Sequence, residues 1–172
     1  MTESENRDII KDQFGKQGNT LINNSMEIWL NKIHITGARR GLGLALAEEY
    51  NNVPMCDCEV FINCKHDNQV DLLYEAAEKG KRIINIGSNS PDEQKKVPHK
   101  YAIEKGALDK ANDQLFYQGV DTTIVRFGYF DSPRVSHIVA NKLDIDYCVY
   151  IIDWILDQPH RIKDMTVVPH KH

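Results

Sequence analysis

From Lys32 onward, short apolar segments alternate with longer amphipathic ones, and this alternation most constrains the fold. Five apolar segments have the length and β-branched content of strands: 33–36, 59–63, 82–86, 122–127 and 165–168. Four segments between them have helical periodicity: 41–50, 69–79, 100–118 and 146–156. The order β-α-β-α-β-α-β-α-β predicts an α/β fold, with helices packed on a mostly parallel sheet.

The chain of 172 residues is long enough for one domain with a hydrophobic core, which we expect over residues 32–172. Residues 1–31 are rich in Asn, Gln, Asp and Gly, which predicts a mobile tail; the alternative is an arm that covers a face or edge of the sheet. The polar start of the chain and the short apolar runs predict a cytoplasmic protein without a membrane span. A net charge of −4 excludes a general attraction to nucleic acid or anionic membranes.

Three of the four cysteines lie close to a histidine: Cys56, Cys58, Cys64 and His66. Their spacing is not the spacing typical of zinc ligands, and Cys58 and Cys64 fall at alternating positions of a predicted strand. We therefore expect buried reduced thiols and no metal site.

A glycine-rich turn, TGARRGLG at 36–43, joins the first predicted strand to the first predicted helix. Glycines at such a junction allow a tight turn and a close approach of the backbone to a diphosphate. The start of the helix presents free N–H groups and a partial positive charge to an anion. In this βαβ context the turn indicates a phosphate-binding site.

Tyr101 and Lys105 are four residues apart at the start of the predicted helix at 100–118, so phenol and ammonium lie on one helix face. A nearby cation favours the tyrosinate form, which suits the phenol to general acid/base catalysis. The alternative is an aromatic side chain beside a solvated lysine. Ser88 follows the strand at 82–86, thirteen positions before Tyr101; alone, such a serine is usually a turn residue.

Together and in this order, TGxxxGxG, the strand-end serine and YxxxK resemble the short-chain dehydrogenase/reductase family. The segment RFGYFDSP at 126–133 is similar to the PGxVxT segment of that family, and the resemblance covers about residues 32–170. It implies a doubly wound, Rossmann-like fold and an enzyme that transfers a hydride between a nicotinamide cofactor and a small carbonyl or alcohol substrate. It also implies NADP as the cofactor, with NAD possible, and a homo-oligomer.

The family's roles carry over only to matching positions. Ser88, Tyr101 and Lys105 would be catalytic: Tyr101 exchanges the substrate hydroxyl proton, Ser88 polarises the carbonyl, and Lys105 supports the tyrosinate and holds the nicotinamide ribose. An arginine in the glycine turn resembles the basic residue of NADP-preferring members. The expected cofactor-binding residues are Gly37, Arg39, Arg40, Gly41, Gly43, Asn63, Lys105, Gly128, Phe130 and Ser132.

The chain departs from the family in the half of the sheet that normally holds strands two and three, because two strands are missing there. The strand at 59–63 resembles the family's fourth strand, but in that position it makes a left-handed crossover, which is rare, if the first helix keeps its usual face. A flavodoxin-like order 2-1-3-4-5 keeps every crossover right-handed, and the sequence leaves both orders open. The family's helix asparagine has no clear equivalent; Asn63 and Asn68 are the nearest. A non-catalytic nucleotide-binding or regulatory protein is therefore the alternative to an active reductase, and a structural subunit is a third hypothesis.

Overall fold

The computed structural model describes residues 32–92 and 99–170; residues 1–31, for which a tail or arm is expected, lie outside the described residues. Five strands form one parallel sheet in the order β1-β2-β3-β4-β5. Their bounds are Ile33–Ile35 (β1), Val60–Asn63 (β2), Arg82–Ser88 (β3), Thr122–Phe127 (β4) and Asp164–Val167 (β5). The helices are Gly41–Glu49 (α3), Gln69–Glu78 (α4), Lys100–Tyr117 (α5) and Ile145–Leu156 (α6), with short 3-10 turns at Ser90–Asp92 (η1) and Pro133–Val135 (η2). The predicted α/β fold is confirmed, and every predicted element is present within two residues of its expected ends.

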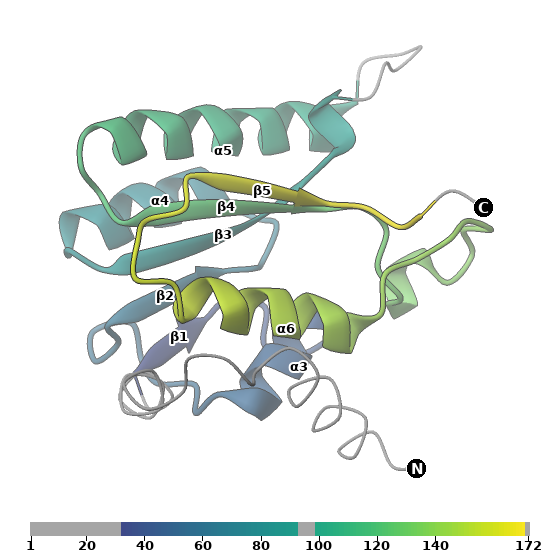
Figure 1. Cartoon of the computed structure of the whole chain (residues 1–172), viewed down its shortest axis with the longest axis horizontal. Coiled ribbons are helices and arrows are strands. Elements are labelled where there is room, and N and C mark those ends of the chain that lie inside the picture. Colours follow the sequence, from purple (N-terminus) through teal and green to yellow (C-terminus); the bar gives the residue numbers. More distant parts are fainter. Residues whose placement is uncertain (1–31, 93–98, 171–172) are drawn as a thin grey trace.

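Helices cover both faces of the sheet: α4 and α5 lie on one face, and α3 and α6 on the other (Figure 1). Successive strand residues point to opposite faces, so Phe61 packs under α4 and α5, whereas Ile62 packs against α3 and α6. In the same way, Ile83 packs on the face covered by α4 and α5, and Ile84 packs on the face covered by α3 and α6. Burial on both faces explains why the strands are continuous apolar runs rather than alternating ones.

The position of β2 settles the strand order. It pairs with β1 on one side and with β3 on the other, so the flavodoxin-like order is wrong. The strands follow one another in chain order from one edge of the sheet to the other, so every crossover advances in the same direction. The crossovers through α3 and α6 lie on one face and those through α4 and α5 on the other, so the two pairs have opposite hands. Two of the four crossovers are therefore left-handed, against the strong general preference. Contacts between α3 and α6 hold this arrangement, and the Tyr50 hydroxyl at the end of α3 donates a buried hydrogen bond to Asp153 of α6.

The free edge of β1 is closed by the chain that follows α3. Val53 donates its backbone N–H to the carbonyl oxygen of Ile33 at 3.0 Å. The side-chain amide of Asn52 pairs with both backbone groups of Ile35, accepting from its N–H at 3.0 Å and donating to its carbonyl at 3.4 Å. Asn52 thus replaces the hydrogen bonds that a further strand would supply, and the edge strand offers little to a pairing partner.

Candidate active site

Two cavities adjoin at the carboxyl ends of the strands, where parallel α/β sheets bind their ligands. The larger, here called the glycine-turn cavity, measures about 680 Å³ and is lined by the turn between β1 and α3 and by the segment after β2. The smaller, the tyrosine cavity, measures about 310 Å³ and is lined by the end of β3 and the start of α5. Phe130, Ser132 and Arg134 line both, so the two form a continuous site.

The glycine turn has a backbone that only glycine adopts without strain. Gly37 and Gly41 have φ values of +73° and +57°. A Cβ on Gly43 would lie 2.2 Å from the carbonyl oxygen of Gly37, so this position has no room for a side chain. The turn is tied to the segment after β2, because the hydroxyl oxygen of Thr36 accepts the backbone N–H groups of Cys64 and Lys65, both at 2.9 Å.

Ser88 and Tyr101 line the tyrosine cavity from two different elements. Ser88 is the last residue of β3 and is buried, and its Oγ accepts a hydrogen bond from the backbone N–H of Ser90 at 3.1 Å. That bond uses an oxygen lone pair and leaves the hydroxyl proton available for donation. Tyr101 is half-buried in the first turn of α5, and His99 lines the same cavity just before it.

Lys105 lies beneath Tyr101, one helical turn farther along α5, and its side chain is only 4% exposed. Its Nζ lies 5.6 Å from the centroid of the Tyr101 ring. The ammonium donates to Oε1 of Gln69 at 2.6 Å and to the carbonyl oxygen of Ile86 at 2.8 Å. Burial lowers the pKa of Lys105 to about 8, and the nearby charge of Arg134 acts in the same direction.

Two further side chains surround the Tyr101 ring. The imidazole of His66 lies 4.7 Å from it, centroid to centroid, and Nε2 of His66 pairs with Glu104 at 2.9 Å. The guanidinium carbon of Arg134 lies 5.6 Å from the ring centroid. Burial lowers the pKa of His66, the charge of Lys105 adds to this, and Glu104 opposes it.

Most of the residues predicted for the site lie around these cavities. Those that line one or both cavities are Ser88, Tyr101, Gly37, Arg40, Gly41, Gly43, Gly128, Phe130 and Ser132. Lys105 lines neither cavity, because it is buried beneath Tyr101 and its ammonium is directed to Gln69 and Ile86. Arg39 is exposed and lines neither cavity. Asn63 is completely buried; its amide donates to the backbone oxygen of Gln69 at 2.8 Å and to Oδ1 of Asn85 at 3.0 Å. Asn63 therefore supports the site from below rather than facing it.

The sequence reasoning missed Gln69 and Arg134, and it considered His66 only as a metal ligand. Gln69 gave no signal, because a polar residue at a helix start is ordinary. Arg134 follows the segment similar to the family's PGxVxT, which was the one available indication. All three become site residues through tertiary contacts.

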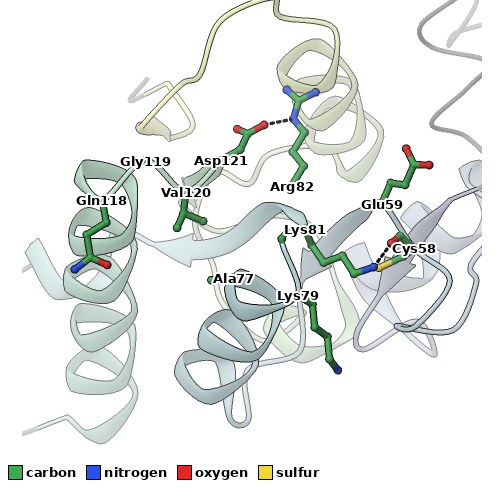
Figure 2. A pocket seen from close by; sticks show the side chains of 11 residues that line it. Cys58, Glu59, Ala77, Lys79, Lys81, Arg82, Gln118, Gly119, Val120 and Asp121 are labelled. Carbon is green, nitrogen blue, oxygen red and sulfur yellow. Dashed lines mark hydrogen bonds and ion pairs between the residues drawn. The ribbon is translucent and has the colours of Figure 1, made fainter.

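A third cavity, of about 670 Å³, lies at the opposite, amino end of the strands (Figure 2). Its charged groups have protein partners: Arg82 pairs with Asp121 at 3.6 Å, and the Lys81 ammonium donates to the carbonyl oxygen of Cys58. Since these cations are already engaged and no candidate catalytic residue is near, we assign no site there.

Over residues 32–92 and 99–170, no group of three or more His, Cys, Asp or Glu side chains is arranged to hold a metal ion. In the same ranges, no helix combines the length and the apolar character needed to cross a membrane. All four cysteines are free thiols; Cys58 and Cys148 are buried, Cys64 is partly buried and Cys56 is exposed.

Comparison with solved structures relates this fold to known proteins. A short-chain dehydrogenase from Streptomyces avermitilis has a TM-score of 0.59 and 15% identity, over 80% of this chain and 88% of that one. A short-chain dehydrogenase from Burkholderia cenocepacia in complex with NADP has a TM-score of 0.59 and 14% identity, over 84% and 90%. A putative NAD(P)-dependent gluconate 5-dehydrogenase from Beutenbergia cavernae, with bound NADP, has a TM-score of 0.61 and 12% identity, over 80% and 94%.

No protein-family model and no curated protein sequence matches the chain. The likeness is therefore one of architecture: the same parallel sheet, with helices on both faces, at sequence identities of 12–15% in these three structures. The chain has the Rossmann-like fold of the short-chain dehydrogenases.

Proposed function

We propose that this protein is an NAD(P)-dependent oxidoreductase that interconverts a small carbonyl compound and its alcohol. One observation carries the proposal: Ser88 and Tyr101 line a single cavity, Lys105 lies directly beneath Tyr101, and the glycine turn lines the adjoining cavity. A proton donor and a hydrogen-bond donor thus meet beside a phosphate-binding turn, as reduction of a carbonyl requires.

The residues of the glycine-turn cavity fit a nicotinamide nucleotide. The absence of a side chain at Gly43 lets the start of α3 lie against the turn, and Arg40 and Lys65 bring positive charge to a phosphate. Ser132 lies where the two cavities meet, beside the expected position of the nicotinamide. A bound reduced nicotinamide would supply the hydride to the substrate carbon.

The side chains of the tyrosine cavity supply the proton and hold the developing charge. The Tyr101 hydroxyl donates its proton to the carbonyl oxygen as that oxygen becomes an alcohol, and the Ser88 hydroxyl donates a hydrogen bond to the same oxygen. The positive charges of Lys105 and Arg134, each 5.6 Å from the ring centroid, stabilise the tyrosinate left behind. The bonds from Lys105 to Gln69 and Ile86 fix the ammonium beneath the phenol.

The test is turnover of a panel of small ketones and aldehydes with NADPH and NADH, followed at the nicotinamide absorbance. Tyr101→Phe removes the acid and should lower kcat by about 10²- to 10⁴-fold. Tyr117→Phe is the matched control, because Tyr117 is 77% exposed at the far end of the same helix. Unchanged turnover in Tyr101→Phe would refute the assignment, and cofactor binding without turnover of any carbonyl would favour the non-catalytic alternative.

A further inference from the structure

We propose that the cofactor site of this chain is a mononucleotide site, in which the nicotinamide ribose phosphate supplies essentially all of the binding and the adenosine half of a dinucleotide supplies none. This inference rests on the proposed function and specifies which part of the cofactor the protein recognises. It would make reduced nicotinamide mononucleotide as good a ligand as NADPH.

The strand order is the first reason. A dinucleotide normally lies across the point where the strand order of a doubly wound sheet reverses, with one mononucleotide-binding half on each side. In this sheet the order runs from β1 to β5 without a reversal, so residues 32–92 and 99–170 form only one such half. The glycine turn follows β1, which is the edge strand, so the adenosine half of a dinucleotide would have no further strand beside β1 to lie against.

The closed edge of β1 is the second reason. In place of a neighbouring strand, the Asn52 amide pairs with Ile35 and the Val53 N–H pairs with Ile33. Ile35 is the last residue of β1, so the amide lies just before the glycine turn. The described chain therefore ends its sheet at this point and provides no strand end on which an adenosine could rest.

The third reason is the position of the available carboxylates. An acidic residue about 20 positions beyond the glycine turn usually binds the adenosine ribose. Here the acidic residues near that interval are Asp57 and Glu59, which precede β2, and Asp67, which follows β2 and lines the glycine-turn cavity. Glu59 pairs with Lys32, before β1, and it lines the cavity at the amino ends of the strands (Figure 2). Asp57 and Glu59 therefore lie at the wrong end of the sheet for the ribose. Asp67 follows β2, which is an inner strand and not the edge strand β1, and it pairs with Lys65 at 3.4 Å.

The charges that remain suit one phosphate. Arg40 and Arg134 line the glycine-turn cavity, and within the described residues neither forms an ion pair with a carboxylate. Lys65 is partly neutralised by Asp67 at 3.4 Å. Arg40 directly precedes α3, whose first turn has no side-chain cap, so guanidinium and helix start can bind the same anion. The phosphate shared by mononucleotide and dinucleotide is that anion.

The experiment measures dissociation constants by fluorescence titration of the full 172-residue chain. The ligands are NADPH, NADH and reduced nicotinamide mononucleotide, with adenosine 2′,5′-bisphosphate as the isolated adenosine half. We expect the three reduced nicotinamides to agree within about threefold, and the bisphosphate not to compete at about 1 mM. NADPH binding more than about thirtyfold tighter than the mononucleotide, or competition by the bisphosphate, would overturn this inference while leaving the proposed function intact.

Two variants test the role of the shared phosphate. Arg40→Gln should weaken all three reduced nicotinamides by the same factor, about tenfold for one charged hydrogen bond. Arg39→Gln, on the exposed side of the same turn, should leave the three affinities equal to one another. A loss confined to NADPH in either variant would show that the turn binds a 2′-phosphate and would refute the mononucleotide site. Failure of every reduced nicotinamide to bind would instead remove the proposed function itself, together with this inference.

Discussion

Replacing Lys105 by methionine should change how the stability of the fold depends on pH. The ammonium is buried, and its pKa in the fold is about 8, whereas the ordinary value is 10.5. Between these two pH values the unfolded chain holds a proton that the folded chain has released, so the free energy of unfolding rises with pH. Below pH 8 both states are protonated and this stabilisation is absent.

The size of the effect follows from the two pKa values. From about pH 7 to about pH 9.5, proton linkage at Lys105 should add about 2 kcal/mol to the free energy of unfolding of the parent protein, and nothing to that of Lys105→Met. Loss of the donor imposes a cost that does not change with pH, and the carbonyl oxygen of Ile86 keeps a second donor, Nε2 of Gln69 at 3.1 Å. The free energy of unfolding of the parent should therefore rise relative to that of Lys105→Met as the pH increases over this range.

The assay is urea unfolding at several pH values, followed by far-ultraviolet circular dichroism. Lys110→Met removes an exposed lysine of the same helix and should keep the pH profile of the parent. Lys105→Gln, which retains a donor for Ile86 and lacks an ionisable group, covers the case in which the methionine variant does not fold. Parallel profiles for the parent, Lys105→Met and Lys105→Gln would refute the burial of a titrating ammonium.

Four further substitutions test the glycine turn, α5, the edge of β1 and the hydrogen bond between α3 and α6. Gly43→Ala, whose Cβ would lie 2.2 Å from the carbonyl oxygen of Gly37, should distort the turn and abolish the cofactor binding that fluorescence titration measures. In Gly106→Ala, within α5, the added Cβ makes an ordinary contact at 3.7 Å, so this variant should raise the free energy of unfolding in urea by up to about 1 kcal/mol. Asn52→Ala, which opens the edge of β1, should lower the free energy of unfolding in urea by about 1 kcal/mol and increase association in light scattering. Unchanged light scattering together with unchanged stability would contradict the capping role. Tyr50→Phe should cost about 1–3 kcal/mol in the same unfolding assay, because it removes the buried hydrogen bond to α6, and a neutral effect would contradict that link.

The elements were predictable because their signals are local. Strands buried on both faces give apolar runs, and these runs located all five strands. The prediction for β3 ended too early, at Ile86, because a glycine follows it. The strand continues because Gly87 pairs with Arg126 of β4, and a Cβ there would lie 2.9 Å from Ile124, so the glycine is required by packing between strands.

The strand order was not predictable, because two general rules pointed in opposite directions. The resemblance to the family predicted β2 between β1 and β3, whereas the preference for right-handed crossovers predicted it on the other side of β1, at the edge of the sheet. The deciding interactions, between α3 and α6, join residues about 100 positions apart, such as Tyr50 and Asp153, and have no local signature.

The candidate site was predictable to the extent that it depends on positions within single elements. The spacing of Tyr101 and Lys105 placed them on one face of α5, and Ser88 ends β3, next to the start of that helix. Asn63 was expected at the cofactor crevice, but alternation along β2 directs it to the side of the sheet that carries Phe61, beneath α4. Residues such as Gln69 enter the site only through tertiary packing.

The uninterrupted strand order has a consequence for how the chain acquires its fold during synthesis. Each strand pairs only with strands that directly precede or follow it along the chain. As the polypeptide leaves the ribosome, every new strand therefore meets an edge that is already available, and none must wait for an insertion between two earlier strands. The pairings of β1 to β4 can therefore form in chain order, and the contacts of α3 with α6 complete the fold once the last helix has been made.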